Sequence, residues 1–462
     1  MGGSEYWYTE RALGQIPRYR SIGDKMKAEI KERIGQVRRG EVPEGYRKTK
    51  NIGIAPCDWE IGQMSDVLHN EQRPVPKPTE AYWRLGLRSH AKGTFHELIE
   101  NPDEINMNEL YEVKENDLIV NITFAWEHAI ALADKADEGL LVSHRFPTYV
   151  FDNGNSPHFY KAVVIQKFFK NMLRNISPGG AGRNRVMSKP AFLKLPCYIP
   201  PITEQQKIAD IINHCDKVID LKKQLIDEKR RQKEWLMQNL LNPDSGVRLP
   251  MFKGSQWKEE AFEELFSFGS SLSASREQLG DKGICYLHYG DIHGNNDYYI
   301  DLKATEHMLP KLDINKPASR YFLNDGDVVF VDASEDYDGA CKYVVINNPE
   351  KIPFISGLHT IPARSKKPVM SILFKQYCFQ SHDIKKQFAF YATGMKVLGL
   401  NKENLCKITV KFPSLPEQAA IANVLSTADS EIDLLEQELE QWQVKKKSLM
   451  QLLLTGLVRV TV

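Results

Sequence analysis

The sequence lacks the short motifs that mark several familiar kinds of enzyme active site. It contains no G-x-x-x-x-G-K-[ST] phosphate-binding loop, no H-E-x-x-H metal motif and no G-x-S-x-G nucleophile elbow. The Asn/Asp-Pro-Pro-Tyr motif of amino-methyltransferases is also absent. The glycine-rich stretch 179–182 does not continue as G-x-G-x-x-G, because Arg185 occupies the last position. These absences argue against an enzyme of these classes, and the sequence predicts no catalytic residues.

Cysteine is sparse, and its positions fit no disulfide or zinc framework. The seven cysteines are scattered without a C-x-x-C pair, which predicts reduced thiols in a cytoplasmic protein. No apolar run approaches the length of a membrane span, and the first residues are not typical of a signal peptide. Histidines such as His69 and His128 have no spaced partner, so no metal site is predicted. The net charge is only +1, so composition alone does not indicate a nucleic-acid binder.

What the sequence does contain is a long internal repeat. Residues 201–241 recur as residues 414–454 at a constant offset of 213, with Glu204-Gln205 matching Glu417-Gln418. Apolar residues recur every three or four positions in each copy, which predicts a helix of roughly 38 residues, about 57 Å long. The sustained seven-residue period favours a coiled coil over two unrelated amphipathic helices on separate cores. We expect a shared seam formed by Ile208, Ile219, Leu225, Ile432, Leu435 and Leu439.

A second level of duplication precedes each helix. Trp59, Met64 and Val67 recur as Trp257, Phe262 and Leu265 at an offset of 198, residues 117–120 recur as 327–330 at 210, and Ser143 recurs as Ser356 at 213. The growing offset indicates roughly fifteen extra residues early in the second copy. The chain therefore reads as globule, helix, globule, helix.

Each globule is predicted to be a mixed α+β domain with one twisted, mostly antiparallel sheet. Strand-like runs occur at 118–124, 160–169 and 328–331, separated by turn residues, and residues 22–37 are predicted to form a short basic helix. The predicted divisions are a charged N-terminal segment (1–50), a first domain (51–200), a first long helix (201–241), a linker (242–256), a second domain (257–413), a second long helix (414–456) and a C-terminal tail (457–462).

Polar and basic loops at matching places in both globules are the candidate binding sites. Arginine and lysine suit guanine edges and phosphates, asparagine can read adenine, and glycine allows close approach of the backbone. The alternative is that these loops are solvated turns without a binding role. The candidates in the first globule are Arg84, Arg88, His90, Lys92, Asn121, Thr123, His144, Arg145, Arg183 and Arg185. Those in the second are His288, Tyr289, His293, Asn295, Asn296, Ser334, His359 and Lys396.

From residue 46 to about 456, this arrangement resembles the specificity (S) subunit of type I restriction–modification enzymes. The most specific features are Pro-x-x-Glu-Gln-x-x-Ile-Ala at 201–209 and Leu-Pro-Glu-Gln-x-x-Ile-Ala at 415–422, each opening a long helix. Gly-Asp-Val-Val-Phe at 326–330 and Thr-Gly-Met-Lys at 393–396 also fit the family. The first copy departs from the pattern where Asn116 replaces glycine before Asp117, which affects only a turn.

The resemblance implies two target-recognition domains and two helices that form an antiparallel coiled coil with pseudo-twofold symmetry. Each domain would read one half of a split double-stranded DNA target. The helices would also bind two methyltransferase (M) subunits that methylate adenine N6, and restriction (R) subunits would join for ATP-driven cleavage. No cofactor is implied for this chain, whereas S-adenosylmethionine, ATP and Mg are implied for its partners.

Two other classes of function remain open from the sequence alone. A structural coiled-coil adaptor would use the same helices, with both globules binding protein partners. An enzyme such as a fused nuclease is the third class, and the missing motifs weigh against it.

Overall fold

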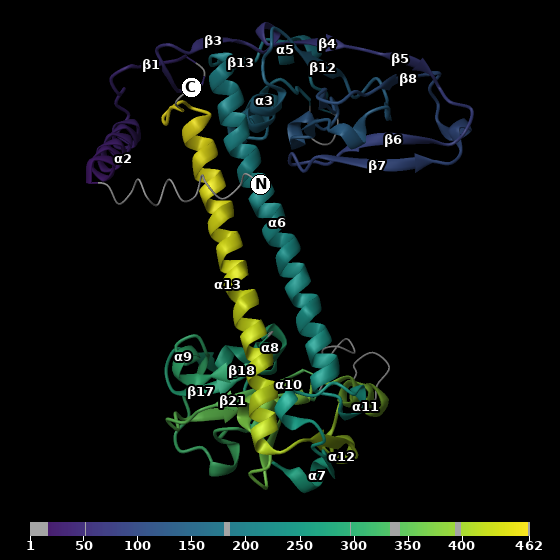
Figure 1. Ribbon diagram of the computed structural model, residues 1–462, viewed down its shortest axis with the longest axis vertical. Coiled ribbons are helices and arrows are strands. Elements are labelled where there is room, and N and C mark those ends of the chain that lie inside the picture. Colours follow the sequence, from purple (N-terminus) through teal and green to yellow (C-terminus); the bar gives the residue numbers. More distant parts are fainter. Residues whose placement is uncertain are drawn as a thin grey trace. The chain divides into compact units, whose positions relative to one another are not determined.

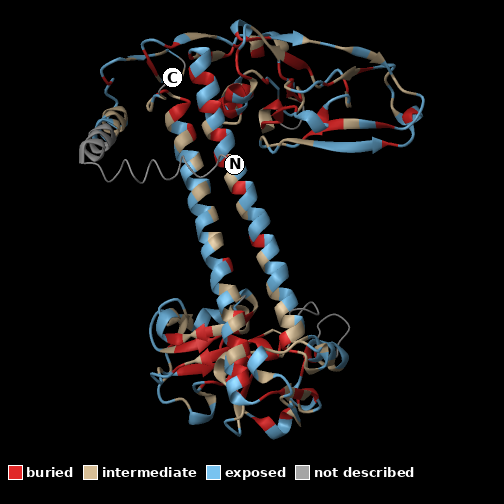
Figure 2. Cartoon of the chain, in the orientation of Figure 1, coloured by how far each residue is buried: buried red, intermediate tan, exposed pale blue. Residues whose placement is uncertain are grey.

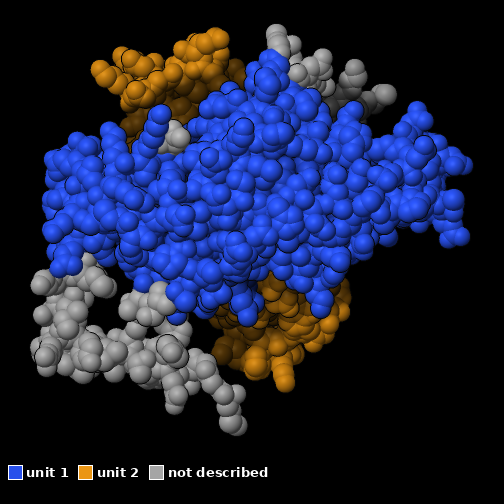
Figure 3. All heavy atoms as spheres, turned by 90° about the horizontal axis from the view of Figure 1, so that it is seen from above, with its two compact units in different colours: residues 1–221, 439–462 blue, residues 222–438 orange. Residues whose placement is uncertain are grey.

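The computed structural model describes residues 17–50, 52–179, 185–295, 297–332, 342–392 and 399–460, with side chains from residue 28 onward. The chain divides into two compact units, residues 1–221 with 439–462 and residues 222–438 (Figure 3). Both divisions fall inside long helices, α6 (Ile202–Leu240) and α13 (Leu415–Leu453). Each unit therefore contains one part of each helix (Figure 1).

The first unit contains two main sheets, with strand orders β10-β9-β12-β4 and β5-β8-β11-β6-β7, and the small pairs β1-β2 and β13-β3. All of its strand pairs in the described residues are antiparallel except β11 with β6. Besides its part of the long helices, its elements are α2 (Pro17–Arg38), β1 (Tyr46–Lys48), β2 (Ile54–Pro56), β3 (Glu60–Gln63), β4 (Leu68–Glu71), β5 (Pro74–Pro76), β6 (Tyr82–Leu87), β7 (Thr94–Ile99), β8 (Glu109–Glu112), β9 (Leu118–Val120), β10 (Ile130–Leu132), β11 (Leu141–Val142), β12 (Thr148–Phe151), α3 (Pro157–Val164), α4 (Lys167–Asn175), α5 (Lys189–Leu193) and β13 (Pro196–Ile199).

The second unit has the sheet orders β15-β23-β20-β21-β18 and β16-β19-β17-β22, and the pair β14-β24. Its elements are β14 (Lys258–Ala261), α7 (Phe262–Leu265), β15 (Phe266–Phe268), β16 (Leu279–Gly280), β17 (Ile284–Leu287), α8 (Tyr289–Gly294), β18 (Tyr299–Asp301), α9 (Leu302–Thr305), β19 (Lys311–Leu312), β20 (Val328–Val331), β21 (Tyr343–Asn347), β22 (Phe354–Ser356), β23 (Thr360–Ser365), α10 (Ile372–Cys378), α11 (His382–Tyr391), α12 (Lys402–Cys406) and β24 (Thr409–Phe412).

The two units share the strand order of one main sheet and a parallel strand pair, so the repeat in the sequence is in part also a repeat in the fold. The order β10-β9-β12-β4 recurs as β21-β20-β23-β15, to which the second unit adds the edge strand β18. The parallel pair of β6 with β11 recurs as β17 with β22. The mixed α+β class and the predominance of antiparallel pairing are confirmed. Each unit nevertheless has two larger sheets, not the single sheet expected from the sequence.

Some local predictions are wrong, and the reason is visible in the side chains. Residues 160–169 were expected to be strand-like but lie in α3 and α4. Ser156 caps α3 by accepting a hydrogen bond from Phe159 N at 3.3 Å, and Pro157 occupies its first turn. The apolar residues of α3 are buried together. A short run of apolar residues in a sequence is compatible with either a buried helix or a buried strand. The strand expected at 118–124 ends at Val120, whereas the strand at 328–331 is confirmed.

The buried Glu-Gln pair at each helix start fixes the helix to its own globule. Gln205 Oε1 accepts from Ser156 N at 2.9 Å, and Gln418 Oε1 accepts from Ser371 N at 2.9 Å. Both serines are the N-caps of short helices, α3 and α10. Each glutamine also donates to a carbonyl five residues earlier in the chain. The repeated motif is therefore a structural joint between helix and sheet domain.

The glutamates meet the tryptophans that open each domain. Trp59 Nε1 donates to Glu204 at 2.9 Å in the first unit, and Trp257 Nε1 donates to Glu417 at 3.4 Å in the second. An arginine from the segment that follows the other long helix lies over each indole ring, and in the first unit this is Arg459, 5.8 Å from the ring centre of Trp59. Arg459 also binds Glu204 and Asp58 through charged hydrogen bonds of 2.7–2.8 Å.

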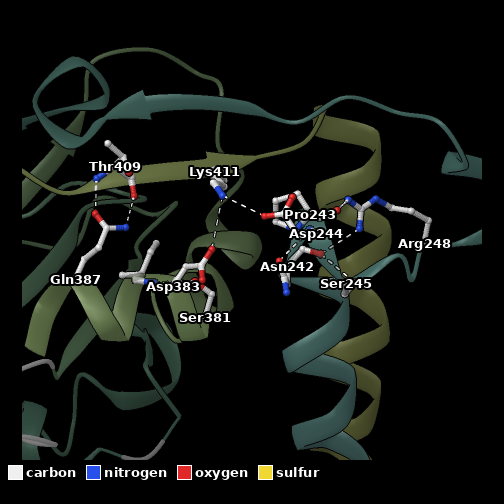
Figure 4. A network of polar contacts seen from close by, with 11 residues as sticks. Asn242, Pro243, Asp244, Ser245, Arg248, Ser381, Asp383, Gln387, Thr409 and Lys411 are labelled. Atoms are coloured by element: carbon white, nitrogen blue, oxygen red, sulfur yellow. Dashed lines mark hydrogen bonds and ion pairs between the residues drawn. The ribbon is translucent and has the colours of Figure 1, made fainter.

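In the second unit, the equivalent arginine is Arg248, which lies 5.3 Å from the ring centre of Trp257. It belongs to the segment after α6, where it donates to the carbonyls of Asn242 and Pro243. Figure 4 shows this segment beside Lys411 of β24, whose ammonium lies 3.4 Å from Asp244 and 3.7 Å from Asp383 of α11. The segment therefore ties the end of α6 to the second domain.

Within each unit, the parts of α6 and α13 run antiparallel. Ion pairs join Asp216 to Lys446 in the first unit, and Lys222 to Glu438, Lys229 to Glu431 and Lys233 to Asp429 in the second. As the residue number rises along α6, that of its partner falls along α13. Buried residues lie where the helices meet the sheet domains (Figure 2), including Ile208 with Met450 and Leu453 in the first unit. In the second unit, Leu240, Ile421 and Leu425 belong to one buried cluster.

The residues expected to form the seam differ in burial, and the exposure of one of them contradicts the prediction. Ile208, Ile219 and Ile432 are buried, and Leu435 and Leu439 are half-buried. Leu225 is 42% exposed, whereas its neighbour Ile226 is only 4% exposed. One residue step turns a helix by about 100°, so a shift of one position moves a side chain from the inner face to the solvent.

We expect Ile226→Ala to destabilise the second unit by about 2–5 kcal/mol, because it removes a buried side chain. Leu225→Ala is the matched control and should change the free energy of unfolding by less than about 0.5 kcal/mol. Urea denaturation followed by circular dichroism measures both. Equal losses in the two variants would contradict the assignment of Ile226 to the inner face.

Candidate nucleic-acid interface

In the first unit, four backbone segments meet at the turn that follows β9. This turn runs from Asn121 to His128. Ile122 N donates to Arg145 O at 2.9 Å, and Met187 N donates to Ile122 O at 2.8 Å. The loop between β6 and β7 joins it through His90 N to Glu127 O at 2.9 Å and Ala91 N to His128 O at 2.8 Å. The predicted stretches around residues 90, 121, 145 and 185, which are separate in the sequence, therefore form one surface.

The loop at 88–93 is the tip of a β-hairpin. Arg88 N donates to Gly93 O at 2.9 Å, and His90, Ala91 and Gly93 have positive φ angles of 65°, 53° and 82°. Behind the tip, the far end of the Phe95 ring packs against Gly86, where an added Cβ would come within 2.3 Å of Phe95 Cζ. The Arg88 guanidinium lies 5.4 Å from the centre of the same ring and donates to the Thr94 carbonyl. The hairpin thus fixes both an aromatic ring and a cation.

The cations around this surface differ in whether they contact other side chains of the protein. Arg84 pairs with Glu97 at 2.6 Å across the hairpin, which neutralises it. Arg185 lies 5.4 Å from the Trp126 ring centre, and His90 Nδ1 lies 3.2 Å from Lys170 Nζ. The remaining candidates, Lys92, His144 and Arg145, are exposed, and Arg183 lies outside the described residues. Exposed cations are suited to phosphates and base edges.

A pocket of about 420 Å³ lies between the hairpin and the turns after β9 and β11. It is lined by four of the residues predicted from the sequence: Arg84, Asn121, Thr123 and Arg145. Sequence reasoning missed its aromatic lining, which includes Phe95, Phe124 and Phe146. For Phe95, a signal was present, since it lies two positions before Glu97, on the same face of β7, and is paired with Gly86 of β6.

The second unit repeats the loop arrangement with different side chains. Asp332 N donates to His359 O at 3.2 Å, which is the counterpart of Ile122 N to Arg145 O. The segment after β17 forms α8 where the first unit has its hairpin. Tyr289 is central here: its ring centre lies 4.3 Å from that of His288, 6.1 Å from that of His293 and 5.5 Å from that of His359. Four predicted residues are therefore neighbours.

Two predicted residues of the second unit have structural roles. His288 is 5% exposed, and its Nδ1 accepts from Gly290 N at 3.0 Å, so the ring caps α8 instead of facing a ligand. Burial lowers the pKa of His288 below its usual value. The side-chain nitrogen of Asn295 donates to Tyr299 O, and its side-chain oxygen accepts from Asp297 N. Asn296, Ser334 and Lys396 lie outside the described residues.

Comparison with known proteins identifies the architecture. The family model for the type I restriction modification DNA specificity domain matches residues 56–228 and 314–442, which together exceed half of the chain. The chain belongs to this family. Its role is that of a specificity subunit in a type I restriction–modification system.

Relatives of this specificity subunit occur in Methanocaldococcus jannaschii. The candidate MjaX specificity subunit of a type I restriction enzyme is 25% identical over 446 residues, covering 90% of this chain and 97% of the relative. The MjaVIII specificity subunit is 24% identical over 311 residues, covering 65% and 70%. A solved structure from work on complex assembly and conformational transition of the type I R-M system has a TM-score of 0.55 at 16% identity, covering 87% of this chain and 99% of that one. That likeness supports the fold.

Other features of the specificity subunit are plain from the described residues. The six cysteines among them are free thiols. No described helix combines the length and apolarity needed to cross a membrane. Within the same residues, no group of three or more His, Cys, Asp or Glu side chains is arranged to hold a metal ion.

Proposed function

We propose that each unit of this specificity subunit reads one half of an asymmetric, bipartite double-stranded DNA target. The observation that carries this proposal is the matched hydrogen bond of the two interfaces, Ile122 N to Arg145 O and Asp332 N to His359 O. It holds equivalent loops in equivalent places while the side chains around it differ. Loops in equivalent positions that carry different side chains are suited to binding two half-sites of different sequence.

In this proposal the chain itself is non-catalytic. The long helices set the unspecified spacer between the half-sites and bind two methyltransferase subunits, which methylate adenine N6. Restriction subunits then join to cleave unmodified DNA. S-adenosylmethionine, ATP and Mg²⁺ belong to the partners. The exposed Arg145 favours DNA over the alternative of a protein-binding adaptor, because it lines a pocket that also holds an asparagine and a threonine.

Methylome sequencing of a host that carries this gene and its methyltransferase gene tests the proposal. The expected result is N6-methyladenine within a split motif that has two unlike halves and a fixed spacer. A host without the specificity gene is the control. A methylated motif that is present in both strains, or a motif with identical halves, would contradict the proposal.

We expect Arg145→Ala to weaken binding of the complex to its target by roughly 1–3 kcal/mol and to relax one position of one half-site. Arg145 is exposed, and only its backbone is needed for the bond to Ile122. Arg174→Ala, an exposed arginine on α4, is the charge-matched control and should leave sequence preference unchanged. Binding to matched and singly mismatched duplexes at several salt concentrations separates base reading from phosphate contact.

A further inference from the structure

The 420 Å³ pocket of the first unit has a shape and lining that an intact duplex does not require. It is lined by residues of β6, of β7, of the turns after β9 and β11, and by Met107 before β8, so its walls come from segments that are far apart in the sequence. Its volume lies within the range of sites that enclose a small ligand. Base edges in a duplex groove need only protruding side chains, whereas a recess can enclose a ring.

The walls of this pocket suit the faces of a flat ring. Phe95 and Phe124 both line it, and they remain 37% and 38% exposed although they are large apolar side chains. Phe95 is held in position by its packing on Gly86. Aromatic side chains stack on unpaired bases of any sequence, and each stack is worth about 1–3 kcal/mol. Exposed aromatic rings in a preformed recess are therefore a stacking platform.

The polar groups of the pocket can read the edge of such a ring. The Asn121 side-chain oxygen is engaged by Thr123 N at 3.0 Å, which leaves the amide of Asn121 to donate. The guanidinium of Arg145 supplies further donors, and both residues line the pocket. The two carboxylates nearby are already engaged, Glu97 by Arg84 at 2.6 Å and Glu127 by Ser89 at 2.7 Å. The free polar groups therefore favour a base edge that presents acceptors.

We propose that this pocket binds a single nucleobase turned out of the DNA stack, with an acceptor-rich edge facing Asn121 and Arg145. This inference rests on the proposed function and adds a mode of reading to it. The extruded base lies in the recognition surface and is distinct from the adenine that a methyltransferase subunit modifies. Unstacking costs a few kcal/mol, which stacking on Phe95 and Phe124 offsets.

The test uses the full chain in complex with its methyltransferase subunits and a duplex bearing the target found by methylome sequencing. Mismatches are introduced one at a time by changing only the partner base. A mismatch at a base pair read within the duplex weakens binding, by roughly 1–3 kcal/mol. At an extruded position it removes the cost of unpairing, so we expect binding to strengthen about tenfold at one pair other than the methylated one.

Phe124→Ala decides whether the extruded base uses this pocket. The side chain is exposed, so the variant should fold, and the strengthening at that one pair should disappear. Phe390→Ala, an 80% exposed phenylalanine of the second unit, is the control and should preserve it. Strengthening at no pair beyond the methylated one, or strengthening that survives Phe124→Ala, overturns the inference and leaves the proposed function standing. Absence of any target-specific binding overturns both.

Discussion

Asp117→Ala should destabilise the first unit by about 3–5 kcal/mol. The Asp117 carboxylate is 2% exposed and accepts hydrogen bonds from both terminal nitrogens of Arg73, at 2.6 and 3.2 Å, and from Lys114 N at 2.9 Å. The Arg73 side chain is itself only 17% exposed, so the substitution leaves a charge that water reaches poorly. The variant should therefore unfold at a markedly lower urea concentration.

The second unit provides an internal comparison. Asp327 is also 2% exposed and accepts from Arg364 at 2.9 Å and from Asn324 N at 2.8 Å. Arg364, however, is 42% exposed, so water can solvate it when the carboxylate is removed. We expect Asp327→Ala to cost less than Asp117→Ala. Asp103→Ala, at an exposed position, is the control for loss of a surface charge; an Asp117 variant as stable as this control would contradict the expected burial effect.

A second large effect is expected from exchanging the first reading surface. Replacing residues 59–195 by the same span of a relative should change one half of the DNA target completely. The exchanged span contains Asn121, Arg145 and the whole hairpin, and it ends before Glu204-Gln205. Because Gln205 bonds to a backbone N–H of the domain, the joint should survive the exchange. Methylome sequencing reads the new motif directly.

The unchanged features of that motif are the control for the exchange. The half-site of the second unit and the length of the spacer should remain as in the parent, because residues 222–438 and both helices are untouched. Exchange of residues 257–413 should have the reciprocal effect. A single exchange that altered both half-sites would show that the units do not read DNA independently.

Sequence was sufficient to predict those features that repeat. The offset of 213 located both long helices, and the match of Asn116 with Gly326 predicted a shared turn. Both residues have positive φ angles, 68° and 77°, a conformation that glycine adopts freely and asparagine tolerates. Because each repeated segment occurs twice in the sequence, a secondary-structure prediction that is ambiguous in one copy can be decided from the other.

Features that depend on three-dimensional packing were harder to predict. Leu225 and Ile226 are both apolar, and only the packing of the second unit shows which one is buried. The pocket beside Asn121 was invisible for a similar reason, since Phe95, Phe124 and Phe146 come from three separate segments. Individual loop residues were found because cations and amides are chemically distinctive. His288 shows the limit of that approach, because the same imidazole can cap a helix.

The position of Arg459 has a consequence for the order in which the protein matures during synthesis. The second unit is continuous in the chain, whereas the first combines residues 1–221 with 439–462. Trp59 and Glu204 therefore leave the ribosome long before Arg459, which lies over the Trp59 ring and binds Glu204. The second unit is complete as soon as residue 438 has emerged. The part of the protein that is translated first thus acquires its full set of contacts last.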